Sequence, residues 1–198
     1  YAEEMVRYAK QNLNIDTNRI IVTGLSLGGG GVWNFAGAQL KNAQQLAAIG
    51  AVCPTYPWVE FCNIAKANLP TWAFHALDDK TVGAYHTQNV LNKIYACPPK
   101  VVPYSTFWPT GGHGIWDRAY DTTYKWQNPN LFEWFLAQDK SLPVNSRPKA
   151  NAGSDITIST TNGKVNLSAL LSTDDDGALV RYTWRKISGP AYGTITTS

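Results

Sequence analysis

The stretch Arg19-Ile-Ile-Val-Thr-Gly-Leu-Ser-Leu-Gly-Gly-Gly-Gly-Val-Trp33 decides the fold of this chain. An apolar run leads into Gly24-x-Ser26-x-Gly28, and a helix-like segment of small residues follows. Strand, tight turn and helix in this order are typical of a nucleophile elbow, which holds a serine on a sharp turn with its hydroxyl exposed. The pattern predicts a strained backbone at Ser26 and collisions of any side chain at Gly24 or Gly28 with the neighbouring strand and helix. Ser26 is therefore the candidate nucleophile.

Outward from this motif, the chain alternates helix and strand signals as far as residue 136. We expect strands at 20–25, 46–52, 69–75 and 101–106, and helices up to residue 13 and at 28–40, 82–96 and 130–136. Such alternation is typical of an α/β fold, in which helices cover a parallel sheet. The composition then changes over residues 139–149, where prolines and polar residues indicate a linker.

Residues 150–198 follow a different pattern. Apolar residues alternate with polar ones between turn sequences, which is typical of a β-sandwich of short strands; they are Ile156, Ile158, Val165, Leu167, Val180, Tyr182 and Trp184. About 50 residues remain here, whereas such a sandwich takes about 100. The chain also opens at Tyr1, without a methionine and inside an amphipathic pattern. We therefore expect both domains to be partial.

Composition and charge exclude some function classes. The net charge of +3 is weak and the basic residues are scattered, which argues against nucleic-acid binding. No apolar run approaches the roughly 20 residues of a membrane span. The three cysteines, Cys53, Cys62 and Cys97, are compatible either with one disulfide and one free thiol or with three buried thiols.

An acid and a base follow Ser26 in the chain. A serine hydroxyl needs a histidine to take its proton, and that histidine needs a carboxylate to orient it. The predicted strand 69–75 runs into Asp78 and Asp79, at the edge where open α/β sheets build their sites. The predicted strand 101–106 leads into His113, which glycines flank. We therefore expect His113 to act as the base, with one of the two aspartates as its partner.

Residues 1–138 resemble the C-terminal half of the α/β-hydrolase family that includes polyhydroxybutyrate depolymerase-like and feruloyl esterase-like carboxylesterases, with prolyl-oligopeptidase-type relatives. The matching segments are 18–29, Trp72-Ala-Phe-His-Ala-Leu-Asp-Asp-Lys-Thr-Val82 and Gly112-His-Gly-Ile-Trp-Asp-Arg-Ala-Tyr120. The family places its acid four residues after a histidine, which implies Asp79, although Ala76 replaces the glycine of that pattern. The resemblance also implies that the backbone N–H of Leu27 is an oxyanion-hole donor and that the second donor comes from an earlier loop.

The second domain resembles the opening half of a polycystic kidney disease (PKD) type Ig-like domain. The resemblance rests on Asn-Ala-Gly-x-Asp at 151–155 and on Ser-Thr-Asp-x-Asp-Gly at 172–177, ahead of Tyr182-x-Trp184. It implies a protein that is secreted or held at the cell surface. The aspartates at 174–176 suit a tight turn better than a calcium site, because Asp and Gly are what such turns require.

Other side chains near these motifs have less specific interpretations. His75 and His86 are expected to be a hydrogen-bonding residue at a strand end and a helix surface residue, so that no metal site is expected. No cofactor is expected either. Trp108 and Trp116 flank His113, and either a substrate pocket or core packing explains them.

The leading hypothesis is a secreted serine hydrolase that cleaves a carboxylic ester through Ser26, His113 and Asp79. Its substrate is expected to be a small-molecule ester or one linked to a polysaccharide, with glycan contact through the PKD-like domain left open. A prolyl-oligopeptidase-type peptidase and a non-catalytic glycan-binding or adhesion protein are the alternatives.

Overall fold

The computed structural model describes residues 2–123, 129–143, 148–157, 165–175, 179, 182 and 184. The chain divides into two compact units, Tyr1–Val144 and Asn145–Ser198.

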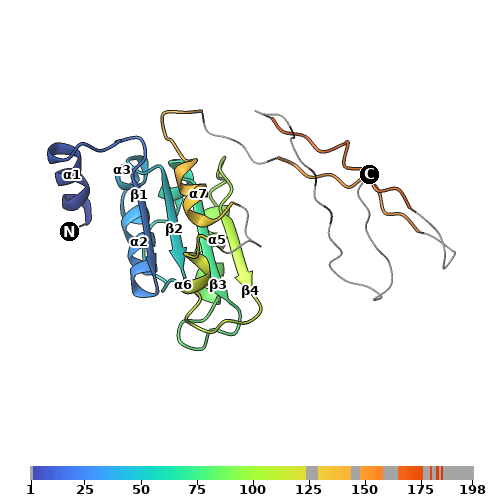
Figure 1. The fold of residues 1–198 in the computed structure, drawn as a ribbon, viewed down its shortest axis with the longest axis horizontal. Helices are drawn as coiled ribbons and strands as arrows, with labels where there is room; N and C mark the ends of the chain where they lie inside the picture. The colour runs from blue at the N-terminus through green and yellow to red at the C-terminus, as the bar shows by residue number, and fades with distance from the viewer. Residues whose placement is uncertain are drawn as a thin grey trace. The chain divides into compact units, whose positions relative to one another are not determined.

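The first unit is built on one parallel sheet (Figure 1). Its strands are β1 (Ile21–Leu25), β2 (Ala48–Val52), β3 (Thr71–Ala76) and β4 (Tyr104–Trp108), and they lie side by side in chain order. The carboxyl ends of β1 and β2 are in register, since Leu25 pairs with Val52, and so are those of β3 and β4, since Ala76 pairs with Trp108. Val52 pairs with Phe74, so β3 continues two residues beyond the end of β2. The loops that leave these four strands therefore begin at the same edge of the sheet.

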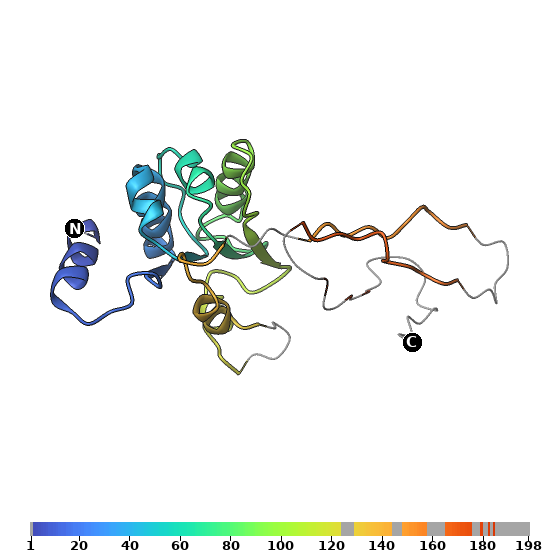
Figure 2. The ribbon, with the colours of Figure 1, turned by 90° about the horizontal axis from the view of Figure 1, so that it is seen from above.

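Helices cover both faces of the sheet (Figure 2). One layer holds α2 (Leu27–Ala38), α3 (Leu40–Gln44), α4 (Cys62–Lys66) and α5 (Tyr85–Tyr95), and the other holds α6 (Trp116–Ala119) and α7 (Leu131–Leu136). Helix α1 (Ala2–Asn12) precedes the sheet and buries none of its residues. Because both faces are covered, every residue of β2 and of β3 is buried, as expected for parallel strands.

The α/β fold is confirmed, and the differences are shifted element ends and three additional short helices. The predicted helix 28–40 ends at Ala38, because Gln39 is extended and separates α3 from α2. Strand β4 begins after Pro103, which has no N–H to donate to a neighbouring strand. Helix α5 begins at Tyr85 instead of residue 82, and the N–H of Val82 binds the Asp79 side chain instead. Three short helices, α3, α4 and α6, were not predicted.

The turn between β1 and α2 is strained, as the sequence predicts. Ser26 has φ 52° and ψ −121°, a backbone conformation that residues other than glycine rarely adopt. A Cβ at Gly24 would lie 2.6 Å from the carbonyl carbon of Gly28, so the expected collision is confirmed there. The prediction for Gly28 was wrong, because a Cβ there would meet open space. The next two glycines are tight instead, because a Cβ at Gly29 would lie 2.9 Å from the Cβ of Pro54 and a Cβ at Gly30 would collide with the Thr55 hydroxyl.

In the second unit, the described residues pair over a single antiparallel bridge between Lys149 and Thr173. The two residues exchange backbone hydrogen bonds of 2.7 and 3.0 Å. No longer strand is assigned among the described residues of this unit, and Ile156 and Leu167 are exposed. A sandwich buries such side chains between two sheets, and the described residues provide no second layer. The predicted strand residues Ile158 and Val180 lie outside the described residues.

The two glycines of the elbow should respond to alanine in opposite ways. Gly24→Ala should lower the free energy of unfolding by about 1–3 kcal/mol, because backbone atoms of Gly28 must move to admit the methyl group. Gly28→Ala should leave it unchanged or raise it by up to about 1 kcal/mol, because the methyl group meets open space and alanine favours a helix. Urea unfolding of the two variants and the parent chain measures this; equal losses would contradict the turn geometry.

Candidate active site

Three side chains from three strand ends meet at the carboxyl edge of the sheet. Ser26 follows β1, Asp79 follows β3 and His113 follows β4. The Ser26 Oγ lies 2.8 Å from His113 Nε2, and His113 Nδ1 lies 2.7 Å from Asp79 Oδ2. Because a carboxylate can only accept, Nδ1 carries the proton, and Nε2 is then free to accept from the serine hydroxyl. The structure thus brings together the three residues that the sequence proposes, in the order serine, histidine, acid.

The neighbouring aspartates have different contacts. Asp79 binds the imidazole ring, whereas Asp78 Oδ1 accepts a 2.8 Å hydrogen bond from the backbone N–H of Gly112. The turn after β3 therefore holds both the ring of His113 and the backbone beside it. The sequence offered both acids, and nothing in it indicated the bond between Asp78 and Gly112.

The Asp79 carboxylate is buried and well supplied with donors. Its Oδ1 accepts the N–H groups of Thr81 at 2.9 Å and Val82 at 3.0 Å. Burial alone would raise the pKa of Asp79, but the hydrogen bonds from His113, Val82 and Thr81 outweigh burial and lower this pKa. Asp79 is therefore ionised at neutral pH and acts as an acceptor only.

His75 lies fully buried beneath this turn. Its Nε2 donates to the Val82 carbonyl at 2.8 Å, so the neutral ring accepts at Nδ1 from the Thr87 hydroxyl at 2.7 Å. The same Nε2 lies 3.3 Å from Asp79 Oδ2. Burial lowers the pKa of His75, which keeps the ring neutral. The predicted hydrogen-bonding role at a strand end is confirmed. The contact with Asp79 was not predicted, because no local pattern places a strand residue against the turn that follows it.

Leu27 is the first residue of α2, directly after the candidate nucleophile. The N–H groups of the first helical turn have no carbonyl partner within the helix. The Leu27 side chain is 79% exposed, so it points into solvent and is not packed against the protein. A role for this N–H in an oxyanion hole stays a prediction.

The two tryptophans beside His113 have different surroundings. Trp108 is buried and stacks on Phe74 with ring centroids 5.8 Å apart, which favours the core-packing interpretation for it. Trp116 is half-buried and meets the His113 ring edge to face at 5.6 Å. Trp116 therefore has the better position to contact a substrate, and a pocket role for either residue stays a prediction.

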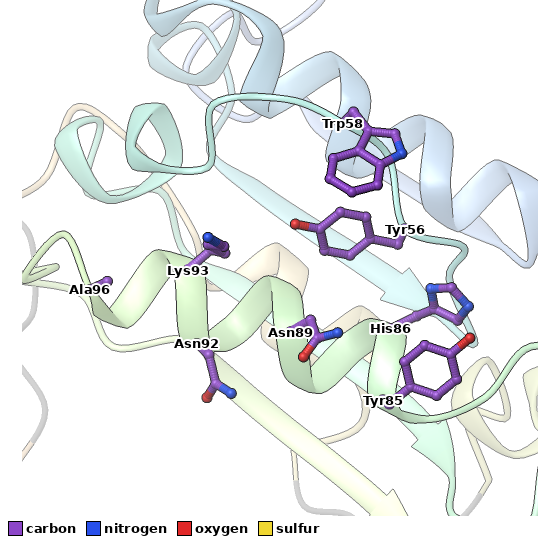
Figure 3. Close-up of a pocket in the computed structure, with 8 residues that line it drawn as sticks. All are labelled: Tyr56, Trp58, Tyr85, His86, Asn89, Asn92, Lys93 and Ala96. Carbon is purple, nitrogen blue, oxygen red and sulfur yellow. The ribbon is translucent and has the colours of Figure 1, made fainter.

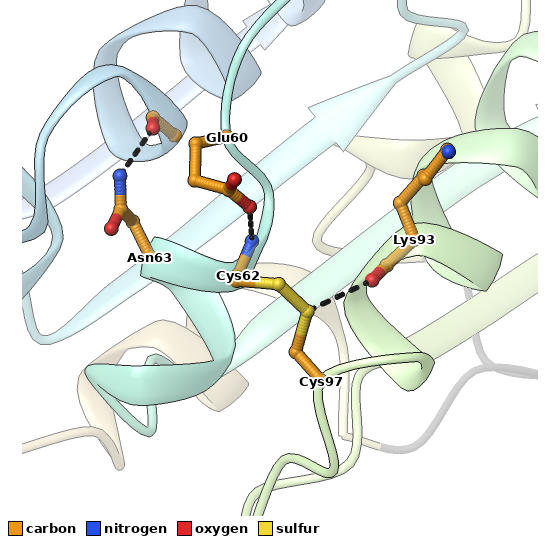
Figure 4. The surroundings of a disulfide bond; sticks show 6 residues. Glu60, Cys62, Asn63, Lys93 and Cys97 are labelled. Carbon is orange, nitrogen blue, oxygen red and sulfur yellow. Dashed lines mark hydrogen bonds between the residues drawn. A yellow bond between two sulfur atoms is a disulfide. The ribbon is translucent and has the colours of Figure 1, made fainter.

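The cysteines separate into one disulfide and one free thiol. Cys62 and Cys97 form the disulfide, which joins α4 to the segment after α5 (Figure 4). Glu60 lies beside these two cysteines, but sulfurs that are bonded to each other provide no thiolate for a metal ion. Cys53 is free and buried, and burial raises the pKa of its thiol to about 11. A thiol that stays protonated is a poor nucleophile, so Cys53 does not compete with Ser26.

In the part of the chain that the structure describes, no helix has both the length and the apolar character needed to cross a membrane.

Solved structures with a similar fold belong to α/β-hydrolases. One is a thermostable esterase, with a TM-score of 0.53 and 26% identity over 70% of this chain and 36% of the esterase. Another is a candidate dienelactone hydrolase from Klebsiella pneumoniae subsp. pneumoniae, with a TM-score of 0.51 and 18% identity over 69% of this chain and 59% of that protein. The chain thus spans less than two thirds of the length of either structure.

Sequence comparison gives a family match within the second unit only. No curated protein matches the chain. The family model described as K319L-like, PKD domain matches residues 152–198. The chain therefore combines part of an α/β-hydrolase fold with a segment that matches the K319L-like PKD domain family.

Proposed function

We propose that this chain carries the nucleophile, base and acid of a serine hydrolase that cleaves carboxylic esters. The observation that carries the proposal is the continuous hydrogen-bonded series from Ser26 through His113 to Asp79. Buried Asp79 fixes the tautomer of His113, and His113 in turn has Nε2 directed at a hydroxyl on a strained, exposed turn. This arrangement matches the requirements for activating a serine.

In the proposed reaction, Ser26 Oγ attacks the ester carbonyl as His113 Nε2 takes the hydroxyl proton. Asp79 stabilises the imidazolium that forms, and the N–H of Leu27 donates to the developing oxyanion. Collapse of the tetrahedral intermediate breaks the ester C–O bond, and His113 returns the proton to the leaving alcohol. Water then attacks the acyl-enzyme with the same proton transfers, which releases the acid and restores Ser26.

The ester class is favoured by the thermostable esterase, whose 26% identity extends over 70% of this chain. The same three residues can also hydrolyse amides, so an activity measurement is needed to distinguish an esterase from a peptidase. Full-length protein should hydrolyse a short acyl ester such as 4-nitrophenyl acetate much faster than a peptide 4-nitroanilide. The reverse preference would favour the peptidase.

An extracellular location is part of the proposal. The disulfide between Cys62 and Cys97 supports it, because disulfides persist in oxidising compartments. The match to a PKD domain supports it as well, because such domains are typical of extracellular proteins.

Replacing the nucleophile should abolish turnover without unfolding the protein. Ser26→Ala removes the attacking oxygen, and residual activity should come only from binding and oxyanion stabilisation. A fluorophosphonate probe should label wild-type protein at Ser26, as peptide mass spectrometry can show, and should not label the variant. Ser105→Ala, which alters an exposed serine of β4, is the control that should keep both activity and labelling. Labelling of a different serine would contradict the assignment.

The two adjacent acids should be distinguishable by the same substitution. Asp79→Asn should lower kcat by about 10⁴-fold, because an amide can donate to His113 Nδ1 and so favour the wrong tautomer. Asp78→Asn should have a much smaller effect, because an amide oxygen can still accept from the Gly112 N–H. Steady-state hydrolysis of 4-nitrophenyl acetate measures both effects. An equal loss in the two variants would contradict the choice of Asp79.

His75 should make the fold sensitive to acid. Its pKa is lowered in the folded state, so the unfolded chain binds a proton that the folded chain excludes once the pH falls below the ordinary value of 6.5. The contribution of neutral His75 to the free energy of unfolding is therefore fully present above pH 6.5. It is lost as the pH falls toward the lowered pKa of the folded state. His75→Gln should melt at a lower temperature at neutral pH but lose less on acidification to about pH 5. Circular dichroism melting curves measure this, with His86→Gln, a substitution of a half-buried ring, as the control. Parallel losses in His75→Gln and wild type would contradict the buried neutral ring.

A further inference from the structure

An open groove of about 720 Å³ lies between the loop after β2 and helix α5 (Figure 3). The loop contributes Tyr56 and Trp58, and the helix contributes Tyr85, His86, Asn89 and Asn92. Its volume is within the usual range for ligand sites. The proposed reaction uses none of these side chains.

Aromatic rings form the exposed surface of the groove. Trp58 is 92% exposed, which is unusual for a tryptophan, and Tyr85 is 59% exposed. The ring of Tyr56 supports Trp58 edge to face at 5.3 Å, and His86 stacks on Tyr85 at 4.2 Å. Each exposed ring therefore contacts a second ring on its own side of the groove.

Amides and one amine complete the lining. The amides of Asn89 and Asn92 have no hydrogen-bond partner in the described part of the chain, and each can both donate and accept. Lys93 adds a positive charge, and no carboxylate lines the groove. The opposite face of α5 is buried in the core, so these polar side chains serve no packing role.

We propose that this groove binds a carbohydrate chain. A sugar ring has apolar C–H faces, which pack against aromatic rings, and hydroxyl groups at its rim, which exchange hydrogen bonds with amides. A purely apolar ligand would bury the two amides without partners, which is costly. The absence of carboxylates from the lining and the presence of Lys93 also accommodate sugars that carry acid groups.

The groove begins at the segments that hold the candidate active site. The N–H of Thr55, next to Tyr56, donates to the Ser26 carbonyl at 3.3 Å. Tyr85 comes three residues after Val82, whose N–H binds Asp79. The groove lining is thus close along the chain to segments that contact Ser26 and Asp79. The inference that a bound sugar chain belongs to an ester substrate rests on the proposed function. Binding itself does not.

The disulfide ties the two walls of the groove together. Cys62 is the first residue of α4, which follows the loop that carries Trp58, and Cys97 directly follows Ala96 at the far end of the groove (Figure 4). Asn63 also donates to the Gly37 carbonyl at 2.8 Å, which fixes α4 to α2. Walls held at a fixed spacing before binding lose less freedom when a ligand arrives.

The test is isothermal titration calorimetry of the chain carrying Ser26→Ala, which prevents turnover during the measurement. The probes are cellohexaose, xylohexaose and hexagalacturonate, which are neutral or acidic sugar chains. At least one should bind. Trp58→Ala and Tyr85→Ala should each weaken that binding about tenfold, the effect of losing one well-placed contact. Trp58→Phe, which keeps a ring, should retain most of the affinity. The double substitution Cys62→Ser and Cys97→Ser should weaken binding, because it releases the two walls.

Tyr8→Ala is the matched control, since Tyr8 is 62% exposed on α1 and lies outside the groove. It should bind as the parent does, and melting curves should show every variant folded. Failure of all three probes to bind would overturn the proposal. Unchanged binding by Trp58→Ala and Tyr85→Ala would also overturn it and would place the sugar site elsewhere, for instance in the second unit. If the chain binds sugar but the wild type hydrolyses no ester, the proposed function is wrong and the sugar site stands. If the wild type hydrolyses esters but the chain binds no sugar, the sugar site is wrong and the proposed function stands.

Discussion

The Asp79 carboxylate receives hydrogen bonds from its own turn and from a loop that follows a different strand. The N–H groups of Thr81 and Val82 bind Oδ1, and His113 binds Oδ2. Without these donors, burial would favour the protonated acid, which could donate and would no longer fix the histidine tautomer. The position of His113 over Ser26 therefore depends on a carboxylate that is kept charged inside the protein. The parallel sheet contributes by starting all three loops at one edge.

Helix α5 connects this carboxylate to the rest of the fold. Its buried face includes Thr87, which fixes His75, and His75 contacts both Val82 and Asp79. Its exposed face lines the aromatic groove. The same helix thus contributes to the core, to the support of the acid and to the proposed sugar site, and the disulfide fixes the chain just beyond its end.

The sequence predicted the parts of the structure that depend on local patterns. The alternation of apolar segments predicted the sheet, and the glycine-rich turn predicted the strain at Ser26. Asp79 could be chosen over Asp78 only from the resemblance to a family, because both acids follow the same strand. The bond from Gly112 to Asp78 joins residues 34 positions apart, so no local pattern could reveal it. The expectation at Gly28 failed because the space around a glycine is set by tertiary packing, which differs between Gly24 and Gly28.

The strained turn at Ser26 has a consequence for how this chain could change over time. A left-handed backbone costs a non-glycine residue about 1–3 kcal/mol, whereas glycine adopts it freely. Selection for stability alone would therefore favour glycine at position 26. Under the proposed function, selection for a reactive hydroxyl keeps a serine there. In that proposal, stability and activity oppose each other at this turn, so a copy of this chain that no longer acts as an enzyme should lose its serine early.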